Sequence, residues 1–259
     1  MQRRQFLTVS AASGLTAKAS KSSSNQYIEV QLFHMRYSRA FQPKRLATFL
    51  EEHHLPMAQR NDFGPVGYFN VTMGADQPML VMTLVYDSLA DMEAKSMRRL
   101  SDKRWMSATD KLGSDIEPAF MRMESSLLRA FDKMPTLVTP KPPAATQPER
   151  IFDLRIYQAE TFRDVREKVR MFNTGEIDLF RKVGVNPVFF GQAVVGPRLP
   201  NLTYLVWYDD MAARQKAWET FLNSAEWKKM ISKPEWANYE IVSNISNIQM
   251  TPLPFSNIR

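Results

Sequence analysis

The chain has 259 residues, of which 44% are hydrophobic, so it is long enough for two domains with well-filled cores. Its formal net charge is +7, but the basic residues are scattered, and we therefore do not expect a nucleic-acid-binding protein. It contains no cysteine, which excludes disulfides, thiolate metal sites and a cysteine nucleophile.

The first residues resemble a bacterial twin-arginine export signal. Arg3 and Arg4 are adjacent, Phe6 and Leu7 follow, and a short segment of small residues leads to an A-x-A cleavage pattern. This segment is too short to be a stable membrane span. We therefore predict an export signal and polar lead-in over residues 1–25, and a periplasmic or secreted protein. The alternative is a basic tail that stays attached.

The rest of the chain contains one domain-sized repeat. The apolar run 80–86 recurs at 202–208, and both copies end in Tyr-Asp (208 − 86 = 122). Trp105 and Trp227 are separated by the same 122 residues. Two copies at a constant offset indicate a duplicated domain, because a solenoid would show more and shorter repeats.

The same order of elements is predicted in both copies. The first copy should contain strands at 27–35, 66–72, 80–86 and 120–128, a helix at 44–63 that Pro56 kinks or restarts, and helices begun by Ser88 and Asp102. The second should contain strands at 152–157, 188–195, 202–208 and 239–248, a helix at 162–183, and a helix begun by Ser224. Each copy is then β-α-β-β-α-β, the ferredoxin-like order of an α+β protein.

Five prolines favour an extended spacer between the copies. We predict a first domain over 26–133, a proline-rich linker over 134–149 and a second domain over 150–259. The runs 80–86 and 202–208 are apolar on both alternating faces, so both faces of each sheet must be covered. Helices can cover one face, and we expect the two sheets to pack against each other as a pseudo-dimer within one chain.

The first strands, 29–33 (EVQLF) and 153–157 (DLRIY), together with the Tyr-Asp pairs and the tryptophan segments, resemble the NIPSNAP family of the dimeric α/β-barrel superfamily. The resemblance covers nearly everything except the signal and the linker, and it implies two tandem NIPSNAP-like domains. Gln31 stands where that family tends to have Arg. Relatives in the superfamily include cofactor-independent monooxygenases, chlorite dismutases and haem-degrading enzymes, which use cavities between helices and sheet or within the barrel.

Candidate ligand-binding residues lie on the first strand of each domain, on the side opposite its aliphatic residues. They are Glu29, Gln31, Phe33, Asp153, Arg155 and Tyr157. We expect these side chains to point into the barrel. There they either orient a small ligand or join the two sheets by salt bridges.

All three histidines fall in the first domain. His34 continues the aliphatic face of the first strand, and His53 lies three residues after Leu50 on the predicted apolar side of its helix. Such a histidine binds haem iron or shuttles protons, or is structural and hydrogen-bonded. The adjacent His53 and His54 lack the i,i+4 spacing of a helical metal site, so we expect no metal.

Glu176 lies on the apolar face of the second-domain helix, four residues after Phe172, and corresponds to His54 (176 − 54 = 122). A carboxylate on such a face either has a partner or borders a cavity. Arg155 suits it by charge, but strand alternation places Arg155 on the other face of the sheet, which argues against this pair.

We interpret the chain as an exported small-molecule-binding or assembly module, with a possible small apolar ligand and possible self-association. The alternative is a cofactor-independent oxygenase or isomerase that acts on an apolar or aromatic metabolite in the barrel cavity. No cofactor is required by either hypothesis. Haem bound through His34 or His53 is a third hypothesis.

Overall fold

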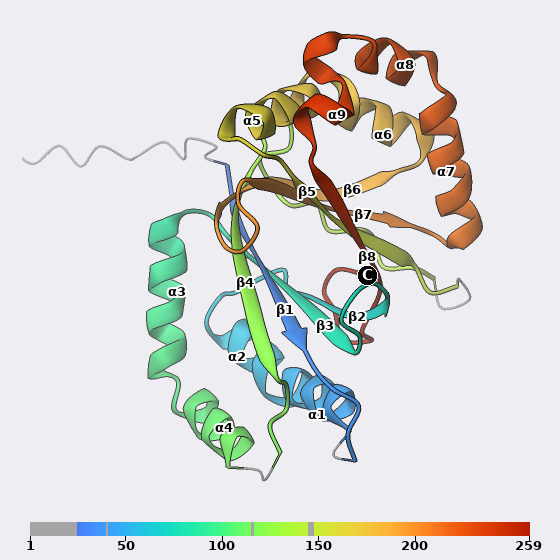
Figure 1. Cartoon of the computed structure of the whole chain (residues 1–259). Helices are drawn as coiled ribbons and strands as arrows, with labels where there is room; N and C mark the ends of the chain where they lie inside the picture. The colour runs from blue at the N-terminus through green and yellow to red at the C-terminus, as the bar shows by residue number, and fades with distance from the viewer. Residues whose placement is uncertain (1–24, 40, 115–116, 145–147) are drawn as a thin grey trace, which may run out of the picture.

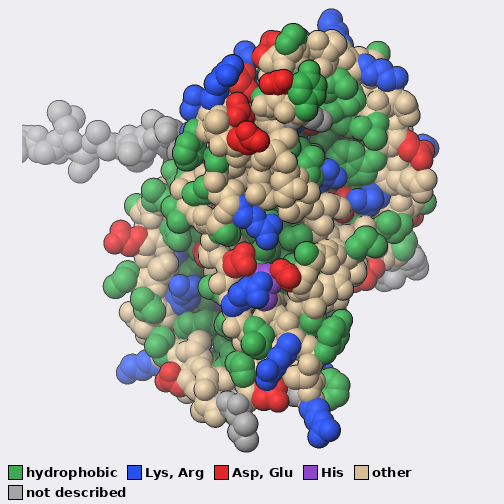
Figure 2. Space-filling model, viewed as in Figure 1, with side chains coloured by type: hydrophobic (Ala, Val, Ile, Leu, Met, Phe, Trp, Pro, Cys, Tyr) green, Lys and Arg blue, Asp and Glu red, His purple; other side chains and the backbone are tan. Residues whose placement is uncertain are grey.

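The computed structural model describes residues 25–39, 41–114, 117–144 and 148–259. The predicted export signal at Arg3, Arg4, Phe6 and Leu7 lies outside these residues. Lys and Arg side chains are spread over the face shown in Figure 2 and do not gather in one extended patch.

The first repeat consists of β1 (Tyr27–His34), α1 (Gln42–Phe49), η1 (Leu50–His54), α2 (Leu55–Arg60), β2 (Gly67–Met73), β3 (Met79–Tyr86), α3 (Leu89–Ser101), α4 (Lys103–Gly113) and β4 (Arg122–Ala130). The second consists of β5 (Ile151–Gln158), α5 (Phe162–Met171), η2 (Phe172–Glu176), α6 (Ile177–Val183), β6 (Asn186–Val195), β7 (Asn201–Tyr208), α7 (Met211–Asn223), α8 (Ala225–Ile231), η3 (Pro234–Trp236), α9 (Asn238–Ile241) and β8 (Asn244–Pro252). Consecutive helical segments form one layer, so each repeat has the predicted β-α-β-β-α-β order.

The strands form one closed barrel in the order β1-β3-β2-β8-β5-β7-β6-β4. Each repeat supplies four neighbouring antiparallel strands, and the pairs β2–β8 and β4–β6 join the repeats. The helices of the two repeats lie outside the barrel at opposite ends of the view in Figure 1. The predicted α+β fold with an intrachain pseudo-dimer is therefore confirmed, and the barrel closes within a single chain.

The interior of the barrel is filled by the aliphatic faces of the strands. Ile28 and Val30 of β1 and Leu154 of β5 belong to one buried cluster, and the rings of Phe69 and Phe152 meet across the repeats with centroids 5.0 Å apart. An eight-stranded barrel is just wide enough for such side chains to fill it.

The candidate residues on the other face of β1 and β5 therefore point outward, toward the helices. The prediction that they point into the barrel is wrong for Glu29, Gln31, Phe33, Asp153, Arg155 and Tyr157. Alternation shows which side chains share a face of a strand. It does not show which face the helices cover when both faces are buried.

Each repeat has a π-helical turn at the same place, since η1 and η2 are 122 residues apart (172 − 50 = 122). A π turn inserts one residue, which rotates the following helix face by about 100°. His54 and Glu176, the last residues of the two turns, are consequently buried against the sheet. His53 is exposed, so the prediction that His53 lies on the apolar side of the helix is wrong.

Two predicted element boundaries also differ. The helix predicted at 44–63 runs without a break over 42–60 and contains the π turn, so Pro56, just after this turn, does not end or restart the helix. The strand predicted at 239–248 begins only at Asn244, because residues 238–241 form the short helix α9. Ile241 of that helix is buried in the core of the second repeat.

The predicted caps of the second helix layer are present in both repeats. The Ser88 hydroxyl accepts a hydrogen bond from the Asp91 N–H at the start of α3. Asp102 caps α4, and Ser224 caps α8 by accepting from the Trp227 N–H. These caps begin the helices that carry Trp105 and Trp227 toward the sheet.

The chain ends on the first repeat. After β8, the Phe255 ring packs 4.9 Å from the Tyr68 ring, and the Ser256 hydroxyl accepts a hydrogen bond from the Tyr68 N–H. This contact, like the β2–β8 pair, fixes the two repeats to each other.

Candidate functional site

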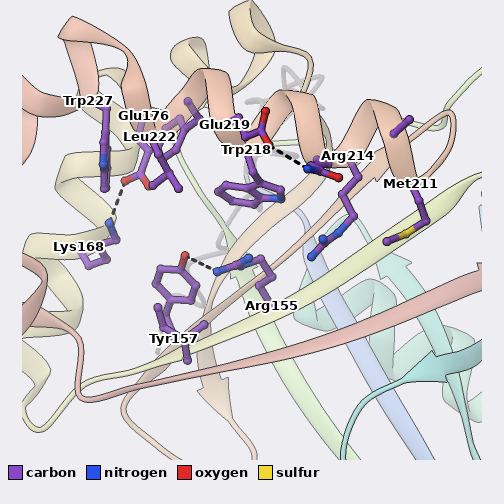
Figure 3. A pocket seen from close by; sticks show the side chains of 14 residues that line it. Arg155, Tyr157, Lys168, Glu176, Met211, Arg214, Trp218, Glu219, Leu222 and Trp227 are labelled. Carbon is purple, nitrogen blue, oxygen red and sulfur yellow. Dashed lines mark hydrogen bonds and ion pairs between the residues drawn. The ribbon is translucent and has the colours of Figure 1, made fainter.

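The second repeat encloses a cavity of about 820 Å³ between β5 and the helices α5, η2, α7 and α8 (Figure 3). Its lining combines charged and aromatic side chains: Arg155, Tyr157, Lys168, Glu176, Met211, Ala212, Arg214, Gln215, Trp218, Glu219, Phe221, Leu222, Trp227 and Ile245. The volume lies in the range of small-molecule sites in other proteins.

Arg155 reaches into this cavity from β5. Its Nη2 donates a hydrogen bond of 3.2 Å to the Tyr157 hydroxyl, and its guanidinium carbon lies 4.6 Å from the centre of the Trp218 ring. The Nε–H is buried and has no hydrogen-bond partner among the described residues. Arg155 is thus held in place by two aromatic side chains while retaining donor capacity for a further group.

Tyr157 connects Arg155 to a second tyrosine. The Tyr204 hydroxyl donates a 3.0 Å hydrogen bond to the Tyr157 hydroxyl. Burial raises the pKa of Tyr204 well above its usual value, so its phenol is neutral and available as a donor. The chain Tyr204–Tyr157–Arg155 therefore fixes the direction of the Tyr157 ring at the cavity floor.

Lys168 and Glu176 form a buried ion pair at one end of the cavity, drawn as a dashed line in Figure 3. Lys168 Nζ lies 3.0 Å from Glu176 Oε2, and both side chains are only 2% exposed. The ammonium also lies 4.9 Å from the Phe172 ring centre and 5.4 Å from that of Trp227. Burial raises the pKa of Glu176, and the Lys168 and Arg155 cations oppose this rise.

Asp153 lies behind the cavity wall and is fully buried. Its Oδ2 accepts a 2.7 Å hydrogen bond from Arg214 Nε. Burial raises the pKa of Asp153, and the Arg214 cation counteracts this effect. Arg214 of α7 therefore already has a carboxylate partner, unlike Arg155.

A corresponding cavity of about 790 Å³ lies between β1 and the helices of the first repeat. Glu29 is on its floor, and its carboxylate accepts three hydrogen bonds: from Gln31 Nε2 at 2.6 Å, the Ser125 hydroxyl at 2.7 Å and the Tyr86 hydroxyl at 2.8 Å. This carboxylate is satisfied by three neutral donors, so its hydrogen-bonding capacity is met without a cation.

His54 lies in the same cavity, where its Nδ1 is 2.7 Å from the Tyr68 hydroxyl. Its ring also meets the Trp105 ring edge-on, with centroids 5.5 Å apart. Burial, together with the Arg99 cation, lowers the pKa of His54 to about 3. The imidazole is therefore neutral at pH 7.

The structure thus divides the candidate residues between two cavities at equivalent positions. Glu29, Gln31, Phe33 and His54 line the first, and Arg155, Tyr157 and Glu176 line the second. The expectation that Arg155 and Glu176 lie on different sides of the sheet is therefore wrong, because the helices cover the polar face of β5. His34 and His53 line neither of them.

Sequence reasoning missed several residues of the second cavity. Lys168 follows Val165 by three residues and precedes Phe172 by four, so a lysine on the apolar helix face was a readable signal. Arg214 and Trp218 had no such signal, because apolar and polar residues are not separated onto different faces of α7.

The NIPSNAP family model matches residues 37–135 and 152–257, which is most of the chain. The chain belongs to the NIPSNAP family.

Solved structures resemble this NIPSNAP protein mainly in fold. A suspected monooxygenase of Fusobacterium nucleatum has a TM-score of 0.58 at 8% identity, over 89% of this chain and 93% of its own. One of Lactobacillus acidophilus has a TM-score of 0.57 at 9% identity, over 88% of this chain and 94% of its own. An uncharacterised NIPSNAP-like domain protein of Burkholderia xenovorans is 22% identical over 42% of this chain and 89% of its own, with a TM-score of 0.38. No curated protein matches the sequence significantly.

His34 of this NIPSNAP protein belongs to a charged cluster. Its Nε2 lies 3.1 Å from Glu124 Oε1, and its Nδ1 lies 3.2 Å from Arg122 Nη2. His53 borders a shallow groove of about 390 Å³. His34 Nε2 makes no hydrogen bond among the described residues despite its closeness to Glu124, and haem bound through His34 or His53 stays a prediction.

Within residues that the structure describes, no group of three or more His, Asp or Glu side chains is placed to hold a metal ion. Likewise, none of the described helices is long and apolar enough to cross a membrane.

Proposed function

We propose that this protein binds a small aromatic acid in the cavity of its second repeat. The observation that carries the proposal is Arg155, whose guanidinium reaches the cavity without a carboxylate bonded to it among the described residues. The other two cations of the cavity already have partners, since Lys168 pairs with Glu176 and Arg214 pairs with Asp153.

The form of the cavity supports an aromatic and planar ligand. Trp218 stacks on Arg155 on one side, and Tyr157 and Trp227 supply further ring surfaces. A ligand carboxylate at Arg155 would gain charge-assisted hydrogen bonds, while its ring would pack against these side chains.

Calorimetric titration with 1-naphthoate and its neutral counterpart 1-naphthol tests the proposal. We expect 1-naphthoate to bind more tightly than 1-naphthol to the wild type. Arg155→Gln should weaken 1-naphthoate at least tenfold, because a hydrogen bond to a charged group contributes about 1.5–3 kcal/mol. Arg163→Gln, which removes an exposed arginine of α5, is the matched control. Equal binding of the two ligands, or no loss in Arg155→Gln, would refute the assignment.

A second candidate function is a cofactor-independent oxygenase or isomerase acting on such an aromatic metabolite. The observation that favours it is Glu176, a buried carboxylate with a raised pKa that lines the same cavity. Such a group can accept a proton from a bound phenol or an activated C–H. The suspected monooxygenases of Fusobacterium nucleatum and Lactobacillus acidophilus share the fold and prompt the choice of assay.

Oxygen uptake with 1-hydroxy-2-naphthoate distinguishes the two functions. An oxygenase should consume oxygen with this substrate, and Glu176→Gln should abolish the uptake while leaving 1-naphthoate binding measurable. Binding without any uptake by the wild type would leave the binding module as the function.

We propose, on the sequence evidence at Arg3, Arg4, Phe6 and Leu7, that the protein is exported. Mass spectrometry of the protein purified from periplasm or medium should give a mass that lacks about nineteen residues. A full-length chain found only in the cytoplasm would contradict export.

A further inference from the structure

The cavity of the first repeat has a different character from the site proposed above. Its walls are mostly apolar and include Phe49, Met82, Leu112, Phe120 and Met123. At about 790 Å³ it is nearly as large as the cavity of the second repeat. The two cavities lie under separate helix layers, and the filled barrel interior separates them.

The charges of the first cavity cancel. Glu29 and Arg99 are its charged lining residues, and they have opposite signs. Both act on the Tyr86 hydroxyl, which lies 2.8 Å from the Glu29 carboxylate. Burial raises the pKa of Tyr86, Glu29 raises it further and Arg99 lowers it, so both charges lie within electrostatic range of one group. An acidic ligand would therefore be repelled by the Glu29 carboxylate as well as attracted by the Arg99 cation. The cost of removing its charge from water would remain uncompensated.

One polar ring in the apolar part of this cavity still has hydrogen-bonding capacity. His54 uses Nδ1 for the Tyr68 hydroxyl, and its Nε2 has no hydrogen-bond partner among the described residues. Because the ring is neutral, Nε2 can donate or accept one hydrogen bond according to the tautomer. The cavity therefore offers an apolar volume with one neutral polar point.

We propose that the first repeat holds a second binding site, for a neutral and largely apolar molecule with one terminal hydroxyl or carbonyl oxygen that hydrogen-bonds to His54 Nε2. The aliphatic or aromatic body of the molecule fills the space between Phe49, Met82 and Met123. This site does not depend on the function proposed for the second repeat.

The test uses 1-octanol and octanoate, which share a chain and differ in charge, in calorimetric titrations with the full chain. We expect 1-octanol to bind at least tenfold more tightly than octanoate. His54→Phe keeps a ring of similar shape and should weaken 1-octanol about fivefold, as expected for one neutral hydrogen bond. The matched control is His53→Phe, which changes the adjacent exposed histidine and should leave binding at the wild-type level.

A second variant keeps the proposal testable if His54→Phe does not fold. Met123 lies at the mouth of the cavity and is 45% exposed, so Met123→Trp should fold and narrow the entrance. It should weaken 1-octanol at least tenfold. Tighter binding of octanoate, or unchanged 1-octanol binding in Met123→Trp or in a folded His54→Phe, would overturn the proposal.

Titration of 1-octanol into protein saturated with 1-naphthoate separates the two sites. The affinity for 1-octanol should not change, because the two ligands occupy different cavities. Competition between the ligands would overturn the second site. Failure of 1-naphthoate to bind would contradict only the function proposed for the second repeat.

Discussion

The two cavities are formed by equivalent strands and helices, but they accommodate buried polar groups in different ways. In the first, His54 at the end of the π turn is neutral, and the buried Leu46 lies about two helical turns before it. In the second, the corresponding residues are Glu176 and Lys168, each 122 residues further along, and they form an ion pair. A buried charge without a partner is costly. The two positions are therefore both charged in the second repeat and both uncharged in the first.

The acids on the cavity floors show the same difference. Glu29 is held by the neutral donors Gln31, Ser125 and Tyr86, whereas Asp153 is held by the cation Arg214 from α7. The first arrangement is built within the sheet alone. The second requires a helix to be docked on the sheet, so stability and ligand binding are more closely connected in the second repeat.

Removing one partner of the buried ion pair should have the largest effect on stability. Lys168→Met leaves Glu176 without its cation, and we expect a loss of about 3–5 kcal/mol in the free energy of unfolding at pH 7. Urea denaturation measures this change. The double variant Lys168→Leu with Glu176→Leu, which resembles the apolar Leu46 of the first repeat, should recover most of the loss. Equal losses in the single and double variants would show that the ion pair is not what distinguishes the repeats.

The tryptophans that dock the outer helices should differ in their contribution. Trp227 is 6% exposed within the core of the second repeat, whereas Trp105 is only partly buried. We expect Trp227→Ala to lower the free energy of unfolding by about 3–4 kcal/mol and Trp105→Ala by about half as much. Thermal or urea unfolding of both variants tests the order. A larger loss in Trp105→Ala would reverse our comparison of the two helix layers.

The dependence of stability on pH should differ in sign between His54 and Glu176. The folded protein keeps His54 neutral down to a pKa of about 3, whereas the unfolded chain takes up the proton near 6.5. The unfolded state therefore binds more protons in this window, and His54 lowers the free energy of unfolding as the pH falls, by up to about 1.4 kcal/mol per unit. Burial raises the pKa of Glu176 above its ordinary 4.5, so its contribution is present at low pH and is lost as the pH rises.

Urea denaturation between pH 4.5 and 6.5 tests this contrast. His54→Phe should flatten the fall in stability on acidification relative to the wild type. Glu176→Gln should not flatten it. Parallel curves for His54→Phe and the wild type would contradict the burial of a neutral His54.

Loss of one neutral donor to Glu29 should have the smallest effect. Ser125→Ala removes one of three hydrogen bonds to that carboxylate, and we expect a loss of about 1 kcal/mol. Ser126→Ala, at the next position on the opposite side of β4, is the matched control. A loss above about 3 kcal/mol would show that Glu29 depends on one donor as strongly as Asp153 depends on Arg214.

Much of the architecture could be predicted from local sequence patterns. The constant offset of 122 residues revealed the duplication. The runs 80–86 and 202–208 are apolar on both faces, which predicted strands covered on both sides. Helix caps such as Ser88 and Ser224 were readable because a capping side chain bonds to N–H groups two or three residues away. The same local reasoning failed at His53 and His54, because a π turn shifts the helix face without an unambiguous sequence signal.

The sequence by itself determined that two β-α-β-β-α-β units exist and which side chains share each face of β1 and β5. Only the tertiary structure decided that the aliphatic faces fill the barrel and that the polar faces meet the helices. It also paired Lys168 with Glu176 and left Arg155 with Tyr157 and Trp218. The physical reason is that periodicity depends on neighbours along the chain. The choice between two buried faces, and the partner of each buried charge, depend on packing between elements that are distant in sequence.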